Sequence, residues 1–422
     1  MSPLGPPRRL VTHLAYYDDG GFIMSSQMNN IRYNPFSAEV LADPAAAHKE
    51  LREKCPVHAF REHQPFFTSL SKHEDVLAAL KNIDVFSSQW GQGPGRKPAI
   101  ALFSDPPNHT KFRRLVNTSF TPRAAMALEP MIVALVEELV SVMGSQAGNK
   151  ADLHDLLAMP LPVIVIARML GVPEDMRDTF KEWSDAQLQG MNMVDPEREI
   201  AARRAMSEYL INEVNIRRDL ITQGSELPKD LISELTQAAM SHDDPLTDAE
   251  MLSMLVQILV GGNETTTSLI TNLVWRLLED RTRWNAVVNN PELIDVAIEE
   301  SLRFDPPVLG LYRTTTCPVT MSETEIPSDE KVMVLYASAN RDPAAWEDPD
   351  TFRLDRDLNQ LRRHLSFGFG LHVCPGAALS RTETRIALRK LIEQFPTLEL
   401  DGEPERIETF LLWGKRTLPV KW

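Results

Sequence analysis

One cysteine lies in a sequence that suits a metal-bound thiolate. Residues 366–376 read SFGFGLHVCPG, so Cys374 follows two glycines and precedes an expected helix whose first residues are Pro375 and Gly376. The glycines permit backbone conformations that other residues avoid, and they let a flat cofactor approach closely. Proline suits a first helical turn, where the helix dipole and free N–H groups lower the pKa of a thiol. A haem iron needs such a thiolate if electron density is to favour cleavage of the O–O bond.

The other two cysteines, Cys55 and Cys317, lie in no comparable motif. A free cysteine is more often a small buried hydrophobic residue than a ligand, and both keep that interpretation. Three cysteines are too few for a disulfide framework, and their spacings match no zinc site. Such usage is typical of a reducing compartment, so we expect a cytoplasmic protein.

A second chemical constellation lies inside an expected long helix. Residues 247–250 read TDAE, which is a capping box, and apolar residues then recur at helical spacing to about Glu279. The middle of this helix reads GGNETTT, although each interior glycine costs roughly 1 kcal/mol relative to alanine. A threonine hydroxyl there can bond a backbone carbonyl and open the helical ladder locally. A kink that eases packing is the plainer explanation for this segment alone. Because the same chain also contains the Cys374 motif, these residues indicate a functional site.

Glu264 and Thr265 are the acid and the alcohol of that segment. Reduction of dioxygen consumes protons, which a carboxylate can relay from solvent while a hydroxyl positions water. The pair is therefore a candidate for proton delivery, and the glycines before it would let a ligand lie against the helix backbone.

These two segments together resemble the motifs of the cytochrome P-450 family. The pattern Phe367-Gly-x-Gly-x-His372-x-Cys374-x-Gly376 resembles the haem-binding signature of that family, and the resemblance extends from about Asn34 to Trp422. It implies haem b as cofactor and Cys374 as the axial ligand of its iron. Phe367 and Gly376 would belong to the haem-binding loop.

The helix segment is similar to the oxygen-activation motif of the same family. The resemblance implies that Gly261 and Gly262 lie beside the haem and that Glu264 and Thr265 are catalytic. Many relatives have aspartate where this chain has Glu264, so this position is a mild variant.

Haem carboxylates need cationic or donor partners. Four residues match propionate-binding positions of the family: His109, Arg113, Arg313 and His372. His109 and Arg113 lie four residues apart, so they share a helix face. An arginine without such context is more often a solvated surface charge.

The resemblance also implies a structural ion-pair network. Glu300 and Arg303 lie three residues apart on a helix that ends at Asp305-Pro306-Pro307, and Arg356 is the expected third partner. In the family such a network locks the core near the thiolate loop, so we interpret the three residues as structural and not catalytic.

Composition and patterning favour one globular domain. The 422 residues are 43% hydrophobic and 24% charged, without a repeat or long linker. We expect a mostly α (α+β) fold, with a helical core around a buried haem and small sheets, over residues 34–422. Residues 1–33 read as a poorly ordered extension. The expected elements are a hairpin over 56–71, a helix over 73–82, a loop over 86–107, mainly helices over 107–279, a strand over 331–336, a helix over 376–395, and strands and turns over 410–422.

The expected function is insertion of one oxygen atom from O2 into an apolar substrate, which is a hydroxylation. By resemblance the pocket is lined by Trp90 to Leu102, Met191, Ile258 to Gly262, Val308 to Leu311 and Phe410 to Trp413. A peroxide-driven haem peroxygenase is one alternative, although the Glu264-Thr265 pair argues against it. A non-catalytic haem sensor or carrier is another.

Partners follow from charge and from missing modules. The net charge of −15 disfavours nucleic-acid binding, and no apolar run is long enough to span a membrane. No flavin or iron–sulfur motif is evident, so we expect electrons to come from a separate ferredoxin and ferredoxin reductase. We also expect the protein to be a monomer. The cationic group Lys111, Arg114, Arg362 and Arg363 is the expected docking patch, with scattered solvated charges as the alternative.

Overall fold

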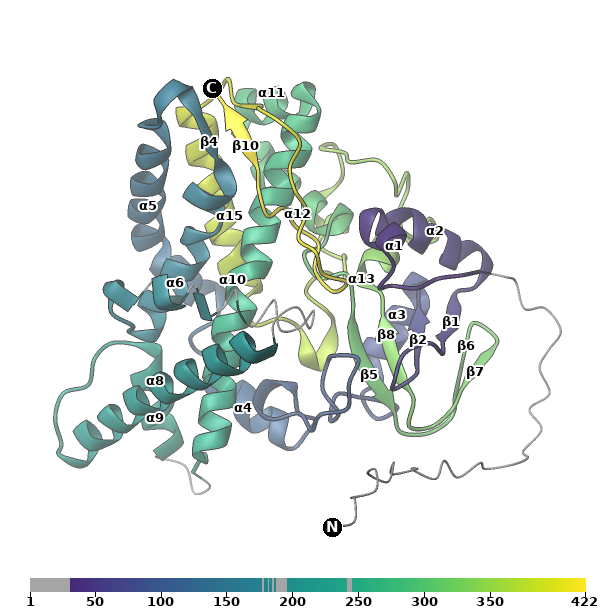
Figure 1. Cartoon of the computed structure of the whole chain (residues 1–422), viewed down its shortest axis with the longest axis horizontal. Helices are drawn as coiled ribbons and strands as arrows, with labels where there is room; N and C mark the ends of the chain where they lie inside the picture. Colours follow the sequence, from purple (N-terminus) through teal and green to yellow (C-terminus); the bar gives the residue numbers. More distant parts are fainter. Residues whose placement is uncertain (1–30, 177, 181, 184–185, 187–195, 241–244) are drawn as a thin grey trace, which may run out of the picture.

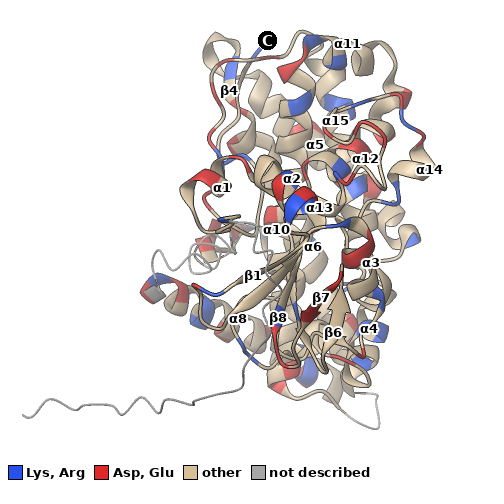
Figure 2. Cartoon of the chain, turned by 90° about the vertical axis from the view of Figure 1, so that its right-hand side faces the viewer, with Lys and Arg blue, Asp and Glu red and all other residues tan. Residues whose placement is uncertain are grey.

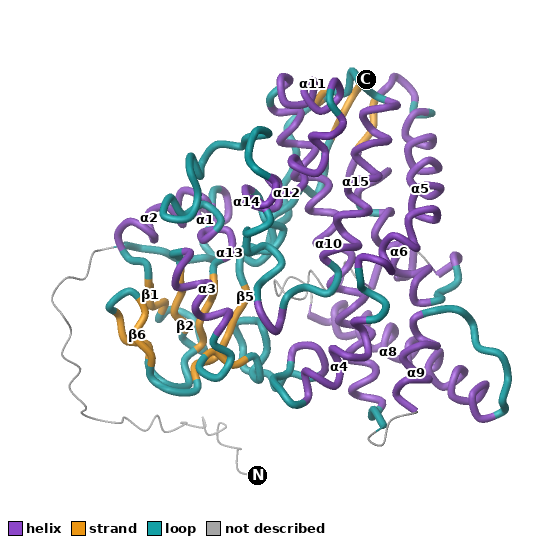
Figure 3. Tube along the Cα trace, turned by 180° about the vertical axis from the view of Figure 1, so that it is seen from behind, coloured by secondary structure: helices purple, strands orange, loops and turns teal. Residues whose placement is uncertain are grey.

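The computed structural model describes residues 31–422 except 177, 181, 184–185, 187–195 and 241–244. Most of its long helices gather on one side of the molecule and its largest sheet lies on the other (Figures 1 and 3). The helices are α1 (Ala38–Ala42), α2 (Pro44–Lys54), α3 (His73–Lys81), α4 (Asn108–Asn117), α5 (Pro122–Gly144), α6 (Pro160–Leu170), α8 (Pro196–Thr222), α9 (Leu231–Met240), α10 (Asp248–Glu279), α11 (Arg281–Asn289), α12 (Ile294–Phe304), α13 (Tyr336–Ala339), α14 (Leu358–Leu361) and α15 (Ala377–Gln394).

Three small sheets complete the described fold. The largest has the order β1-β2-β8-β5-β3, the second β4-β10-β9, and the third pairs β6 with β7. The strands are β1 (Val57–Phe60), β2 (Phe67–Leu70), β3 (Phe86–Ser87), β4 (Lys150–Asp152), β5 (Leu311–Thr315), β6 (Val319–Met321), β7 (Thr324–Ile326), β8 (Lys331–Val334), β9 (Glu399–Leu400) and β10 (Pro419–Lys421). The mostly α fold with small sheets is confirmed.

Helix α10 runs through the centre of the molecule (Figure 1). The predicted capping box is confirmed: the Thr247 N–H donates to Glu250 Oε2 at 2.8 Å, and the Glu250 N–H donates to Thr247 Oγ1 at 3.3 Å. The helix continues without a break through Gly261 and Gly262. Its C-terminal half packs into the largest apolar cluster with α5, α12 and α15, and this burial offsets the low helix propensity of its middle.

The five-stranded sheet contributes residues to two apolar clusters. The hairpin predicted over 56–71 is confirmed as β1 and β2, which pair Phe60 with Phe67, and β2 runs parallel to β8. One apolar cluster joins the sheet to α3, whereas the other gathers aromatic rings that include Phe67 and Tyr312. The sheet thereby holds Arg313 of β5 in a buried position.

Several boundaries differ from the sequence-based expectation. Helix α15 begins at Ala377 with Gly376 as its N-cap, so Pro375 and Gly376 precede the helix. The expected 86–107 loop contains β3 and the short 3-10 helix Ala101–Phe103. Strand β4 lies in the expected helical region because it pairs with β10 at the far end of the chain, which local patterning does not reveal.

The expected N-terminal extension is described only from residue 31 onward. Tyr33, which we placed in that extension, is buried, and its hydroxyl lies 3.3 Å from His48 Nε2. The packed chain therefore includes Tyr33, because its aromatic ring buries a large apolar area. No helix within the described ranges is long and apolar enough to cross a membrane.

Candidate active site

The Cys374 loop is a tight turn that its glycines make feasible. Gly368 and Gly370 have φ angles of +70° and +69°, which only glycine adopts readily. A Cβ atom at Gly370 would lie 3.2 Å from the Leu80 carbonyl oxygen, so α3 approaches the loop closely. The Cys374 N–H donates to the Phe367 carbonyl at 2.8 Å and closes the loop.

The electrostatic surroundings of Cys374 correct one expectation. Burial raises the pKa of its thiol, although the N–H groups of Gly376 and Ala377 and the guanidinium of Arg113 act in the opposite direction. The expected lowering of the thiol pKa is therefore wrong for the polypeptide alone, because burial outweighs the helix N-terminus. A coordinated metal ion deprotonates a thiol outright, so the anionic form would depend on bound iron.

His109 and His372 come together from α4 and the Cys374 loop. Their ring centroids lie 4.4 Å apart, and burial lowers the pKa of His109 to about 4, with His372 and Arg113 contributing. His109 Nδ1 and both ring nitrogens of His372 are buried without a hydrogen-bond partner among the described residues. The nearest acid, Asp105, is 3.7 Å from His372 Nε2, beyond hydrogen-bonding distance. Buried ring nitrogens with unused hydrogen-bonding capacity, beside the guanidinium of Arg113, fit an anionic cofactor such as a haem with its carboxylates.

Arg113 and Arg313, which are far apart in the sequence, both lie near the Cys374 loop. Arg113, on α4, is half-buried and close enough to Cys374 for their charges to interact. Arg313 is buried, donates to the Tyr312 carbonyl at 2.8 Å and interacts with Tyr336. The Tyr336 hydroxyl would contact a Cβ atom at Gly368, so this tyrosine links Arg313 to the loop. The structure thus places His109, Arg113 and His372 at the loop and links Arg313 to it through Tyr336.

The glycines of α10 are not required for close packing against described side chains. A Cβ atom at Gly261 would meet nothing within 4 Å outside the helix, and one at Gly262 would only reach Ile166 at 3.8 Å. Thr265 is partly exposed, and its hydroxyl donates to the Gly261 carbonyl at 2.7 Å. The next two threonines are buried. Thr265 is therefore the threonine of this segment that can meet a ligand.

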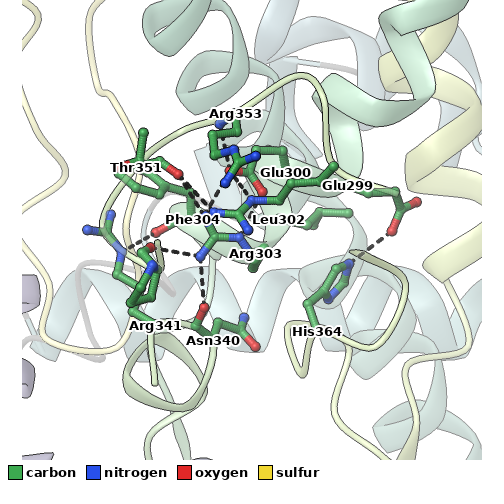
Figure 4. Close-up of polar contacts among 12 residues, drawn as sticks. Glu299, Glu300, Leu302, Arg303, Phe304, Asn340, Arg341, Thr351, Arg353 and His364 are labelled. Atoms are coloured by element: carbon green, nitrogen blue, oxygen red, sulfur yellow. Dashed lines mark hydrogen bonds and ion pairs between the residues drawn. The ribbon is translucent and has the colours of Figure 1, made fainter. Parts of the chain in front are cut away.

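The predicted Glu300–Arg303–Arg356 network is confirmed, and Figure 4 shows its Glu300 and Arg303 members. Arg303 donates to both carboxylate oxygens of Glu300, at 2.7 and 2.8 Å, and Arg356 Nε donates to Glu300 at 3.2 Å. Arg303 also donates to the carbonyl oxygens of Asn340, Pro349 and Thr351. The side chains of Glu300 and Arg303 are fully buried, so this network joins α12 to the segment before the Cys374 loop.

Sequence reasoning missed a second network beside the first. Glu299 accepts hydrogen bonds from His364 Nε2 at 3.0 Å and from Arg381 Nε and Nη2 at 2.5 and 2.9 Å. The only local signal was a second glutamate next to Glu300, and nothing in the sequence pairs Glu299 with residues more than 60 positions away.

Four of the five expected pocket segments are joined in pairs. Ile258 and Leu259 of α10 share an apolar cluster with Ala101 and Leu102, and Gln257, the residue before that α10 segment, donates to the Ile100 carbonyl at 2.8 Å and accepts from the Leu102 N–H at 3.0 Å. The Leu309 N–H donates to the Leu411 carbonyl at 2.8 Å. The fifth, Met191, lies outside the described residues.

The expected docking patch is mostly exposed. Arg114, Arg362 and Arg363 are exposed, whereas Lys111 is half-buried. Figure 2 shows basic residues on α4 among interspersed acidic and basic positions over the rest of the chain. Two apolar residues of the Cys374 loop, Phe369 and Val373, are 43% and 39% exposed. Exposed arginines at 362 and 363 therefore precede the loop in the chain, and two exposed apolar side chains lie within it.

A helical fold around a cysteine loop, with buried donors for an anionic cofactor, defines a haem-thiolate protein. Comparison with known proteins agrees. The family model described as Cytochrome P-450 matches residues 44–290 and 285–422. The chain is 36% identical over 395 residues to the cytochrome P-450 monooxygenase PikC of Streptomyces venezuelae, covering 90% of this chain and 91% of the relative.

Two further relatives broaden the comparison. Erythromycin C-12 hydroxylase of Saccharopolyspora erythraea is 34% identical, with 85% of this chain and 92% of the relative covered. The crystal structure of CYP109E1 from Bacillus megaterium in complex with testosterone superposes with a TM-score of 0.81 at 31% identity, covering 91% of this chain and 98% of the other. The chain belongs to the cytochrome P-450 family and is a monooxygenase with a haem-thiolate iron cofactor.

Proposed function

We propose that this protein hydroxylates a bulky, largely apolar organic molecule with one oxygen atom from O2, using haem b bound through Cys374. The observation that carries the proposal is the convergence of the Cys374 loop with His109: His109 Nδ1 and both ring nitrogens of His372 are buried and lack partners among the described residues. Haem content and the carbon monoxide spectrum of the reduced protein test it.

Haem, when bound, supplies the activation of dioxygen. Cys374 would ligate the iron, and His109, Arg113, Arg313 and His372 would neutralise the two carboxylates. Gly261 and Gly262 leave room beside α10, and Phe367 and Gly376 shape the loop around the sulfur: a Cβ atom at Gly376 would lie 3.8 Å from Cys374 Sγ.

Thr265 and Glu264 would manage protons. Because the Thr265 hydroxyl donates to Gly261, its oxygen keeps its lone pairs for a water molecule, which it would orient toward the reacting oxygen. Glu264 lies one residue away on the same helix, with Ser268 Oγ 3.5 Å from its carboxylate. It would exchange protons with solvent and recharge that water.

The substrate class follows from the apolar pocket segments. The relatives include an enzyme named for erythromycin and a structure with testosterone, and both are bulky molecules with much apolar surface. A spectral screen of macrolides and steroids against the ferric protein, in which a bound substrate displaces water from the iron, tests this class. A screen in which only small polar molecules shift the spectrum contradicts it.

We propose that electrons come from an acidic ferredoxin docked at the surface around the Cys374 loop. The cations Arg114, Arg362 and Arg363 would attract it, and exposed Phe369 would supply apolar contact. A peroxide-driven reaction would not need this surface. Turnover supported by NAD(P)H, ferredoxin and its reductase, and faster than turnover with peroxide, would decide between them. A haem sensor would show neither.

A further inference from the structure

One carboxylate, that of Glu299 on α12, binds both ends of the Cys374 loop. His364 lies two residues before residues 366–376 and Arg381 lies five residues after them. Both side chains donate to Glu299, His364 through Nε2 at 3.0 Å and Arg381 through two nitrogens at 2.5 and 2.9 Å. The His364 side chain points toward Glu299, away from the Glu300–Arg303 cluster (Figure 4). Loop ends that share one anchor cannot move apart independently.

Hydrogen bonds and burial determine the protonation states in the Glu299–His364–Arg381 cluster, which we call the clasp. The Ser366 N–H donates to His364 Nδ1 at 3.2 Å, so Nε2 carries the proton that Glu299 accepts. Burial lowers the pKa of His364, and donors from His364 and Arg381 outweigh burial and lower the pKa of Glu299 to about 2. Near neutral pH the clasp therefore holds a neutral histidine, a carboxylate and a guanidinium.

Arg381 extends the clasp toward the sulfur. Its guanidinium stacks over the Phe367 ring at 4.5 Å and donates to the Ala377 carbonyl at 3.2 Å. The Phe367 carbonyl accepts the Cys374 N–H, and the charge of Arg381 reaches the Cys374 sulfur. Arg381 is thus a cation whose charge acts on the Cys374 sulfur, and Glu299 is its buried counterion.

The chain contains a matched pair of residues for comparison. Arg385 lies one turn after Arg381 on α15, and Asp295 lies one turn before Glu299 on α12. Arg385 Nε donates to Asp295 at 2.7 Å. This second α12–α15 ion pair is more exposed, with side chains 37% and 41% accessible, and no described contact joins it to the Cys374 loop.

We propose that Glu299, His364 and Arg381 are positioning residues that hold the Cys374 loop for iron ligation and adjust the charge felt by the sulfur. The proposal rests on Cys374 as the iron ligand. It assigns two separable tasks: a mechanical one, keeping both loop ends on Glu299, and an electrostatic one, balancing the Arg381 cation against the Glu299 anion.

The electrostatic task is tested by the reduction potential of the holoprotein. Arg381→Met leaves Glu299 without its cation and should disfavour the added electron, whereas Glu299→Gln leaves Arg381 uncompensated and should favour it. We expect opposite shifts of about tenfold in the reduction equilibrium, which is about 59 mV for one electron. Arg385→Met and Asp295→Asn should leave the potential unchanged. Loss of packing alone would move the reduction potentials of both clasp variants in the same direction. Potential shifts of the same sign in Arg381→Met and Glu299→Gln, or equal shifts in the two control variants, would therefore overturn the electrostatic task.

The mechanical task is tested by how long the thiolate stays bound. Glu299→Asp keeps the charge but shortens the side chain, so it cannot reach both loop ends. We expect the thiolate-type carbon monoxide spectrum to decay about tenfold faster in mild urea than in wild type, with the potential unchanged. Asp295→Asn should decay at the wild-type rate. A wild-type decay in Glu299→Asp refutes the clasp.

Variants that fail to bind haem are replaced by milder ones. Arg381→Lys keeps the cation but not the two-nitrogen contact, and it should restore the potential while leaving the decay fast. If Arg381→Lys matches Arg381→Met in potential, the charge has no role. A wild-type thiolate spectrum in Cys374→Ser would refute Cys374 as the iron ligand. This outcome is distinguishable from failure of the clasp, which leaves the ligand assignment intact.

Discussion

The Thr265 hydroxyl donates to the carbonyl of Gly261, one turn earlier on α10, at 2.7 Å. This contact orients the hydroxyl oxygen and leaves its lone pairs for water. Thr265→Ala should therefore still bind haem and substrate and still consume reductant. More of that reductant should appear as hydrogen peroxide, because proton delivery becomes disordered. The measurement is product and peroxide formed per NAD(P)H.

Two variants sharpen this prediction. Thr265→Ser keeps the hydroxyl and should restore coupling. Glu264→Gln should slow the whole catalytic cycle by roughly 10²–10⁴-fold, which is the usual size of a general acid–base effect. Thr266→Ala is the control on a buried neighbour. Wild-type rate and coupling in Thr265→Ala, and also in the Thr265–Thr266 double variant, would end the proton-delivery role.

Cys374→Ser should abolish the long-wavelength carbon monoxide band that thiolate-ligated haem shows, because serine supplies no thiolate. Cys55→Ser and Cys317→Ser are the matched controls, since both cysteines are free and neither lies in the loop. Absorption spectra of the reduced, carbon monoxide-treated proteins give the answer. Loss of the band in a control variant instead would reassign the ligand.

Removing one member of the buried Glu300–Arg303 pair should yield little folded holoprotein. The remaining charge would be buried without its partner, which costs about 3–5 kcal/mol. Glu300→Ala and Arg303→Ala should each lower the melting temperature and the haem content. Arg353→Ala removes a half-buried arginine whose partner, Asp355, is exposed, and it should stay near wild type in both measurements. Equal stability of all three variants would show that the buried pair carries no special weight.

Charge reversal at Arg362 and Arg363 should slow reduction by an acidic ferredoxin and flatten its salt dependence. Screening limits exposed charges to about 8 Å at physiological ionic strength, so the wild-type rate should fall as salt rises. Stopped-flow reduction over a salt series measures both effects. Arg416→Glu, an exposed position outside the patch, is the control. If the patch variant and the control reduce alike, docking lies elsewhere.

Glu383 on α15 should make stability depend on pH. Burial raises its pKa to about 8 from an ordinary 4.5, and Oε2 has no hydrogen-bond partner among the described residues. Between these values the unfolded chain loses the proton while the folded chain keeps it, so stability is full below pH 4.5 and is lost as pH rises toward 8. At about 1.4 kcal/mol per pKa unit, the total loss is a few kcal/mol.

Glu383→Gln removes this titration with little change in shape. The variant should gain stability over wild type progressively from pH 4.5 to 8, with a constant advantage beyond. Urea denaturation at a series of pH values measures the difference. Glu393→Gln, on the exposed end of the same helix, should show no such trend. A difference that does not change with pH would mean that Glu383 is ionised in the folded protein.

Local patterns were sufficient for the elements and motifs whose signals lie close together in the sequence. The capping box, the hairpin, the glycine conformations at Gly368 and Gly370 and the Glu300–Arg303 spacing are each contained in a few residues, and each predicted correctly what forms there. The reason is that turn geometry, helix caps and side chains three or four residues apart obey local sterics and hydrogen bonding.

Only the tertiary structure decided which distant groups meet and with what electrostatic result. The Cys374 motif predicted a lowered thiol pKa, but the depth of burial, which no motif encodes, reversed the sign. Strand β4 forms because β10 lies beside it, and Glu299 joins His364 to Arg381 because α12 packs against α15. Burial and long-range pairing depend on the whole packed chain, so residues that act through them become visible only after folding.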